Sequence, residues 1–254
     1  MNTWTICRRE LTSYFRSPIA YGVMAFFGLI SGYFFFAIVL NFVRASIEST
    51  FQGQGGPMSM NDFVVRPLLS NISVIGLFLI PMITMRLFAE EKRSGTIELL
   101  VTSPVRDLEI ILGKWLAAMI LYACMLGISA LSMVTLFIYG KPDWHPMAVG
   151  YLGLLLQGGC LLAIGTFIST CTKNQIVAGV AGFAVCLLLW VLDWASSFGQ
   201  SVAARVISYL SVLQHYDSFS KGVLDTKDII YYASAIFIGL FLTARSLESL
   251  RWRA

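Results

Sequence analysis

Charged residues are scarce in this chain of 254 residues. Only 13% of the residues are charged, whereas a soluble domain of similar length carries about 25%. Hydrophobic residues make up 57% of the chain. The apolar runs are too long and too numerous for the core of one soluble domain, so we expect an integral membrane protein.

Other features are missing as well. The net charge is only +4 and no run of Lys and Arg exceeds two residues, which argues against a nucleic-acid partner. The cysteines have no metal-ligand spacing and none lies in an expected external loop, so we expect neither a metal site nor disulfides. No cleavable signal peptide is visible, because the first apolar run begins near Ile19 and is long enough to remain a membrane span.

The sequence contains no GxxxxGK[ST] motif, which is the loop that cradles nucleotide phosphates. The nearest string, Leu112–Trp115, has neither the preceding loop nor the hydroxyl residue. We therefore expect no cofactor in this chain, and any energy for active transport must come from another chain.

Six apolar stretches predict a bundle of transmembrane α-helices, because irregular backbone is not tolerated in lipid. All six fit within one transmembrane domain over residues 1–254. Residues 42–71 are expected to form a polar loop, of which 60–69 could lie on the bilayer surface, and Pro81 is expected to break the second span. The expected spans are 19–41, 72–88, 110–139, 147–170, 176–194 and 229–246.

An amphipathic helix is expected before the first span, within residues 1–18. Apolar side chains recur along 3–17 at three- and four-residue steps, which favours a helix in the membrane interface that Pro18 ends. A short soluble helix on another subunit is the alternative. The apolar side holds Trp4, Cys7, Leu11, Tyr14 and Phe15, and the polar side holds Thr5, Arg9, Thr12 and Arg16.

The distribution of basic residues predicts the orientation. With the N-terminus inside, twelve of the eighteen Lys and Arg residues lie on the inner side, and residues 86–114 supply five of them. Cytoplasmic loops are enriched in Lys and Arg. We therefore expect both termini in the cytoplasm.

The segment 86–114 is the longest charge-rich interruption of the apolar sequence. Ser94 and Gly95 predict a turn, and Ser103 and Pro104 predict the N-cap and first residue of the next helix. Between them, 96–102 can form only a short helix that is unstable alone and has apolar side chains around most of its circumference. Such a surface favours docking on a partner; packing against the ends of its own spans is the alternative.

Three further places hold candidate residues. The turn Cys171–Gln175 is either a second docking contact through Lys173 and Asn174 or an ordinary loop. In the segment 195–228, His215 and Asp217 are candidates for contact with a polar substrate or are satisfied interfacial residues. We find no paired carboxylate and nucleophile around His145 or His215, which argues against a hydrolase. Asp193 is the acidic residue expected nearest the membrane interior. Glycines of 147–194 are expected to let helices approach closely.

Phe88–Leu100, with the sequence FAEEKRSGTIELL, and Thr102–Val105 resemble the motif of ABC-2 type transporter permeases. Further similarity, to the gliding-motility-associated branch, lies at Ile80–Arg86, at Gly113 and Lys114, and within 214–228. It extends over nearly the whole chain.

The resemblance implies an ABC-2 (type V exporter-like) permease fold in a bacterial inner membrane. It implies a homodimer or a pair with a related permease, working with a cytoplasmic ABC ATPase subunit that binds ATP and Mg. The motility branch also suggests an extracytoplasmic subunit. The coupling segment, 89–109, would dock on the ATPase. Its expected docking residues are Glu90, Glu91, Lys92, Arg93, Gly95, Thr96, Ile97, Glu98, Leu99, Leu100, Ser103 and Pro104.

The leading hypothesis is therefore a permease subunit of an ABC exporter. Two alternatives are a membrane scaffold that recruits a cytoplasmic protein without transport, and an intramembrane enzyme, against which the missing catalytic set argues. The cargo is not specified; a lipid-linked, polymeric or hydrophobic one suits the apolar intramembrane surface.

The docking hypothesis predicts the effect of two substitutions. Glu98→Ala and Leu100→Asp should each abolish stimulation of the partner ATPase and leave membrane insertion intact. Full coupled activity in both variants, measured as ATPase rate with and without the permease, would contradict docking through this segment.

Overall fold

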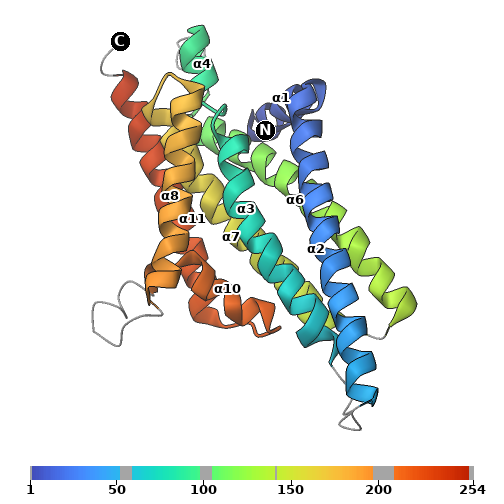
Figure 1. The fold of residues 1–254 in the computed structure, drawn as a ribbon. Helices are drawn as coiled ribbons and strands as arrows, with labels where there is room; N and C mark the ends of the chain where they lie inside the picture. The colour runs from blue at the N-terminus through green and yellow to red at the C-terminus, as the bar shows by residue number, and fades with distance from the viewer. Residues whose placement is uncertain (1, 52–58, 98–104, 141, 197–208, 252–254) are drawn as a thin grey trace.

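The computed structural model describes residues 2–51, 59–97, 105–140, 142–196 and 209–251, and all regular structure within these ranges is helical (Figure 1). Six of its helices are long and apolar enough to cross a membrane, as predicted. The elements are α1 (Asn2–Arg16), α2 (Pro18–Phe51), the π-helix η1 (Asn61–Val65), α3 (Arg66–Thr84), α4 (Ala89–Ser94), α6 (Asp107–Tyr139), α7 (Trp144–Cys171), α8 (Gln175–Ser196), α10 (Val212–Ser220) and α11 (Thr226–Arg251).

The long helices run alternately up and down, so that α1, α4 and the end of α11 lie at one end of the bundle (Figure 1). We call this the α4 end. Helix α10 lies across the opposite end, below α7 and α8, and we call that the α10 end. The two ends carry separate groups of candidate residues.

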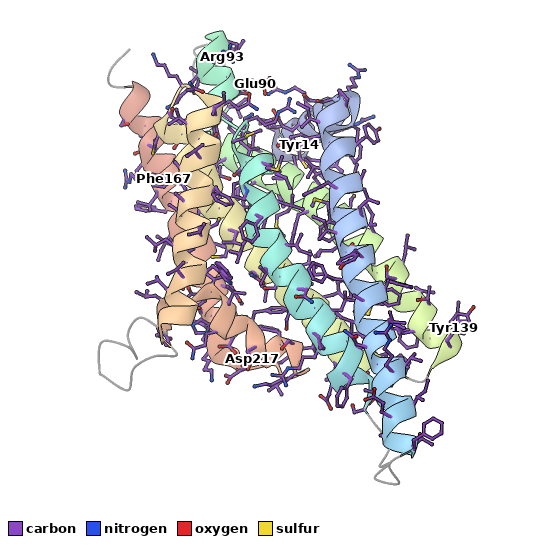
Figure 2. All side chains as sticks on the ribbon, in the orientation of Figure 1. Tyr14, Glu90, Arg93, Tyr139, Phe167 and Asp217 are labelled. Atoms are coloured by element: carbon purple, nitrogen blue, oxygen red, sulfur yellow. The ribbon has the colours of Figure 1, made fainter. Side chains whose placement is uncertain are left out.

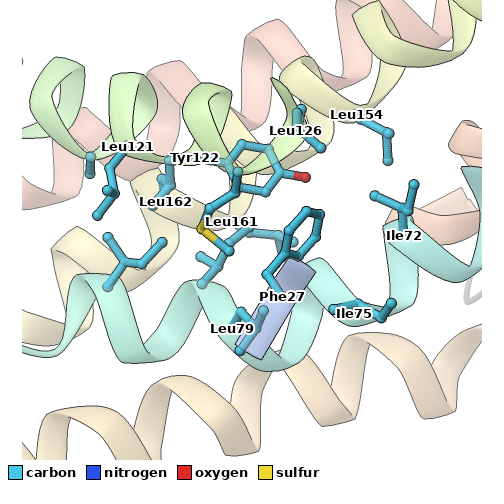
Figure 3. Close-up of a cluster of buried hydrophobic side chains, with 14 of the residues drawn as sticks. Phe27, Ile72, Ile75, Leu79, Leu121, Tyr122, Leu126, Leu154, Leu161 and Leu162 are labelled. Atoms are coloured by element: carbon cyan, nitrogen blue, oxygen red, sulfur yellow. The ribbon is translucent and has the colours of Figure 1, made fainter. Parts of the chain in front are cut away.

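Helices α3 and α7 form the centre of the bundle. Buried residues make up 72% of the most apolar window in the α3 region and 67% of that in α7, against 17% in α2, α8 and α11. Leu79 of α3, Leu161 of α7 and Tyr122 of α6 belong to the buried core, which Phe27 of α2 also joins (Figure 3). The outer helices therefore leave large apolar faces for lipid or for other chains.

Glycines of α7 bring its neighbours into close contact, as predicted. A Cβ atom at Gly158 would lie 2.1 Å from a ring atom of Tyr122, and one at Gly165 would lie 2.3 Å from Thr84 Oγ1. On α8, a Cβ at Gly182 would lie 3.4 Å from Pro81. The approaches at Gly158 and Gly165 depend on the missing side chain, because the neighbour occupies the space that it would fill, whereas the distance at Gly182 is an ordinary van der Waals contact.

The prediction of a polar loop over 42–71 is wrong. Helix α2 continues to Phe51, and the chain is again helical from Met60 through η1 into α3. The 34 residues of α2 span about 51 Å at 1.5 Å per residue, against about 30 Å of hydrocarbon. Hydropathy falls near residue 42, but residues 42–51 contain no Gly or Pro, the residues with the lowest helix propensity, so the helix continues.

Two other expectations concern helix ends. Pro81 does not break the second span, because it lies inside α3, which runs on to Thr84. Helix α1 ends at Arg16 and Pro18 begins α2, as predicted. Where the bilayer begins and ends along these helices stays a prediction.

The glycine contacts predict that alanine substitution lowers stability at one helix-interior position and not at another. Gly158→Ala should lower the unfolding temperature of the purified protein, because the displaced Tyr122 ring costs about 1–3 kcal/mol. Gly127→Ala is the matched control on α6, where nothing lies within 4 Å of the added atom. Equal unfolding temperatures for the two variants would show that the close approach at Gly158 contributes nothing.

Candidate functional site

The α4 end contains a short helix that is fastened to α7 at its first turn. The backbone N–H groups of Phe88 and Ala89 both donate to Ser169 Oγ at 3.1 Å. The Ser169 hydroxyl faces the carbonyl oxygen of Met85 at 3.4 Å. First-turn N–H groups have no partner within their own helix. In α4, the Ser169 side chain of α7 accepts hydrogen bonds from these N–H groups. The start of α4 is therefore fixed to the centre of the bundle.

The other end of α4 is a turn, as the sequence predicted. Gly95 has φ +74°, a left-handed conformation that glycine adopts without steric cost. Arg106, rather than Ser103, caps α6, and its N–H donates to Glu109 Oε2 at 3.3 Å. The prediction that Ser103 caps this helix is therefore wrong.

A buried lysine joins three helices at this end. Lys114 of α6 is 1% exposed. Its Nζ lies 3.0 Å from Glu10 Oε1 of α1 and 2.9 Å from Glu91 Oε1 of α4. The Phe88 ring centroid lies 5.3 Å from the same nitrogen. We call this group of residues the Lys114 cluster; it consists of Lys114, Glu10, Glu91, Phe88 and Arg9.

Arg9 completes the charge balance of this cluster. Its Nη2 lies 3.2 Å from Glu10 Oε1 and 3.7 Å from Glu91 Oε1, and its side chain is 60% exposed. Two cations therefore face two carboxylates. Burial of an ion is costly unless partners compensate it, and removal of one partner from a buried pair is strongly destabilising. The ion pairs of the cluster thus hold α1, α4 and α6 together.

A second ion pair connects the stem of α4 to the N-terminal helices. Arg86 Nε lies 3.2 Å from Glu90 Oε2, and Arg86 Nη1 donates to Ser17 Oγ at 3.5 Å. Ser17 separates α1 from α2. Arg86 therefore connects α4 to the junction between α1 and α2.

The predicted docking residues fall into three groups. Exposed on α4 and its turn are Glu90, Arg93, Gly95 and Thr96, and Figure 2 shows Glu90 and Arg93 at the α4 end, far from Asp217 and Tyr139. The side chains of Glu91, Lys92 and Ile97 are half-buried; Ile97 packs against the core of its own chain. Outside the described residues lie Glu98, Leu99, Leu100, Ser103 and Pro104.

The second predicted docking turn lies directly beside α4. The Lys92 ammonium donates to the carbonyl oxygen of Thr170, at the end of α7. Burial lowers the pKa of Lys92, and nearby Lys173 lowers it further. Lys173 is exposed, whereas Asn174 Oδ1 accepts the N–H of Ile176 at 2.9 Å and so caps α8. The two turns therefore form one continuous surface, with Lys173 as its outward-facing charge.

At the α10 end, Asp217 lies on the surface between two cations. Arg66 Nη2 is 3.0 Å from its Oδ1, and the Lys221 ammonium contacts its other oxygen. Burial alone would raise the pKa of Asp217, but the hydrogen bonds from Lys221 and Arg66 outweigh it and lower the pKa. Asp217, a candidate for contact with a polar substrate, is thus already paired within the chain. Its pair with Arg66 joins α10 to α3.

His215, by contrast, lies inside the α10 end and is 5% exposed, and a carboxylate that the sequence did not single out lies beside it. Its Nδ1 is 2.7 Å from Asp228 Oδ1 of α11, and its Nε2 is 3.1 Å from the carbonyl oxygen of Tyr209. The ring stacks on Tyr231 with centroids 3.9 Å apart. Both ring nitrogens of His215 thus contact groups of the chain itself. The residue therefore helps to pack α10 against α11. Nothing described places the Asp193 side chain.

Sequence reasoning missed Glu10, Ser169 and Asp228, whose partners are 104, 80 and 13 residues away. A signal existed for Glu10. It follows Cys7 by three residues and precedes Tyr14 by four, so it stands within the buried stripe of α1. A carboxylate on a buried stripe demands a cation opposite it. No local pattern marks Ser169 or Asp228.

The Lys114 cluster predicts a large cost for losing its central cation. Lys114→Met should lower stability by about 3–5 kcal/mol, because Glu10 and Glu91 would stay buried without it. Adding Glu10→Gln and Glu91→Gln to the same chain should restore part of the loss. The control is Lys227→Met, which removes an exposed pair with Asp225. Thermal unfolding in detergent measures all three, and equal midpoints for Lys114→Met and Lys227→Met would refute the cluster's role.

Comparison with known proteins adds independent information. The model of a family described as "ABC-2 family transporter protein" matches residues 4–247. Two curated relatives, from Escherichia coli strain K12 and from E. coli O157:H7, are named "Probable multidrug ABC transporter permease YbhR". Each is 23% identical over 163 residues, which is 63% of this chain and 43% of the relative. The chain thus matches less than half of the length of these relatives.

The family match covers α4 and the first five apolar helices and reaches residue 247 within α11, and it agrees with the resemblance in Phe88–Leu100. The similarity to a gliding-motility branch stays a prediction. This chain is an integral membrane protein and belongs to the ABC-2 family of transporter permeases.

Proposed function

We propose that the chain is the permease subunit of an ABC exporter and that a separate ATPase subunit drives it through α4. Membership of an ABC permease family implies a partner ATPase. The observation that carries the proposal is the attachment of α4. Its first turn is held by Ser169 of α7, and its Glu91 is held by the buried Lys114 of α6.

This attachment makes α4 suitable for transmitting movement. A displacement of α4 reaches α6 and α1 through Lys114, whose nitrogen contacts Glu91 and Glu10 together. It reaches α7 through Ser169 and through the contact of Lys92 with Thr170. Packed helices shift as rigid bodies rather than deform continuously. Since α3 and α7 form the centre of the bundle, ATP-driven movement of α4 would tilt the core.

The exposed side of α4 specifies the partner surface. Arg93 and Glu90 supply charges of both signs, and the sequence adds Glu98 with the apolar Leu99 and Leu100. The complementary surface is a groove with an apolar floor and a polar rim. Lys173 of the neighbouring turn would extend that rim. The partner would bind ATP and Mg, and this chain neither.

The α4 end would face the cytoplasm of a bacterial cell whose inner membrane holds the bundle. Basic residues support this orientation, because α1, α4 and the starts and ends of the adjoining helices hold most of the Lys and Arg of the chain. Both termini would then be cytoplasmic, and α10 would lie at the outer mouth.

A second permease copy or a related permease would pack on an apolar outer face of α2, α8 or α11, and an extracytoplasmic subunit on the α10 end. The curated relatives are named as probable multidrug permeases. With the apolar outer faces, this supports a hydrophobic or lipid-linked cargo moved outward.

Site-specific photo-crosslinking tests the docking surface. With p-benzoylphenylalanine in place of Arg93, illumination of membranes should link the permease to an ATPase subunit that carries a Walker motif. The control places the same residue at Tyr139, which is 89% exposed at the other end of the bundle. Crosslinks to the ATPase from Tyr139 but not from Arg93 would contradict docking on α4.

Coupling is then measured as the ATPase rate of the crosslink partner with and without the permease. A rate that the permease stimulates supports transport. A partner that docks at Arg93 but whose ATPase rate never responds would mean that the chain is a scaffold.

A further inference from the structure

A basic pocket lies between α1 and the end of α3, at the α4 end and apart from the exposed face of α4. Four arginines line it, and the hydroxyl groups of Ser and Thr residues complete the lining, with no acidic residue among them. Three of the arginines project from α1, whereas the fourth comes from a position 70 residues further along the chain than Arg16. They are Arg8, Arg9, Arg16 and Arg86.

The positive charge of this pocket is only partly neutralised. Arg9 faces Glu10 and Glu91, and Arg86 faces Glu90. The side chains of Arg8 and Arg16 have no carboxylate partner among the residues that the structure describes. A pocket that holds two arginines without a carboxylate partner suits an oxyanion, because each guanidinium group can donate two hydrogen bonds to it.

The places of the lining residues in the chain indicate how deep in the membrane the pocket lies. Ser17, which lines it, directly precedes the apolar helix α2, and Arg86 lies two residues after the end of α3. With the predicted spans, both places fall where the hydrocarbon would end, at the level of lipid headgroups. An apolar surface adjoins the pocket: Phe15 packs on Tyr21 with ring centroids 6.1 Å apart, and Ile19 is 48% exposed. A ligand held here would thus have a polar head and an apolar neighbour.

We propose that this pocket binds a phosphate ester, namely the headgroup of an anionic phospholipid whose acyl chains lie along the start of α2. The exposed hydroxyl side of α1 and the guanidinium of Arg86 would hold the phosphate. Occupancy would join α1 to the end of α3 beside the Lys114 cluster, since Arg9 belongs to both sites. The proposal does not rest on ATPase docking, because lipid binding is measured on the permease alone.

The test is lipid binding to the purified full-length protein in neutral detergent, followed by native mass spectrometry during titration with phosphatidylglycerol. The variant R8Q/R16Q removes the two arginines without a carboxylate partner and leaves both ion-paired ones intact. It should weaken phosphatidylglycerol binding by about tenfold or more, as expected when charge-assisted hydrogen bonds are lost. Phosphatidylcholine, whose headgroup has no net charge, should bind wild type more weakly than phosphatidylglycerol does.

The matched control is R93Q/R245Q, which removes the same charge from exposed positions of α4 and α11 near the same end of the bundle. Its affinity for phosphatidylglycerol should stay within about twofold of wild type, because surface charges outside the pocket act only through a screened field. Equal weakening in the two double variants would overturn the proposal, since net charge alone would then explain binding. Inorganic phosphate and glycerol phosphate form the third arm. Displacement of the lipid by either at equal concentration would overturn the assignment to a lipid.

Discussion

The burial of one ammonium group constrains the whole α4 end of this permease. Lys114 can lie within an apolar bundle only because Glu10 and Glu91 reach it from two other helices. Its position therefore dictates where α1 lies and how α4 leaves the membrane. Asn2 Nδ2 of α1 donates to Glu109 Oε2 of α6 at 3.2 Å and so joins these two helices at a second place. We infer that these charges favour one register between α1, α4 and α6, because any other register would leave an ammonium or a carboxylate buried without a partner.

The sequence predicted the class and the number of crossing helices, because apolar runs of this length have few other structures available in a membrane. It also located the turn at Gly95 and the close approaches of the α7 glycines. It placed helix ends poorly where hydropathy and helix propensity differ. The segment Phe42–Phe51 is polar enough to leave the bilayer, yet it contains no breaker, so the helix continues.

For the candidate site, the sequence predicted which segment of the chain forms it. It did not predict which side chains of that segment contact the rest of the chain. Glu91 and Lys92 were expected to meet a partner, but the structure turns both inward, to Lys114 and to the end of α7. Glu90 and Arg93 remain outward. Periodicity cannot separate these neighbours, because α4 has six residues and its buried side is decided by α1, α6 and α7. The pairing of His215 with Asp228 was missed for a similar reason, since it joins two helices through a turn.

Helix α4 and the start of α6 should move as one body, because Lys114 joins them. Spin labels at Arg93 of α4 and at Leu108 of α6, which is 60% exposed, measure the distance between these elements in the complex with its ATPase. In wild type, one narrow distance distribution should persist with and without ATP. In Lys114→Met, the distribution should broaden when ATP is added. A distance that shifts with ATP in wild type, or an equally narrow distribution in Lys114→Met, would contradict the account.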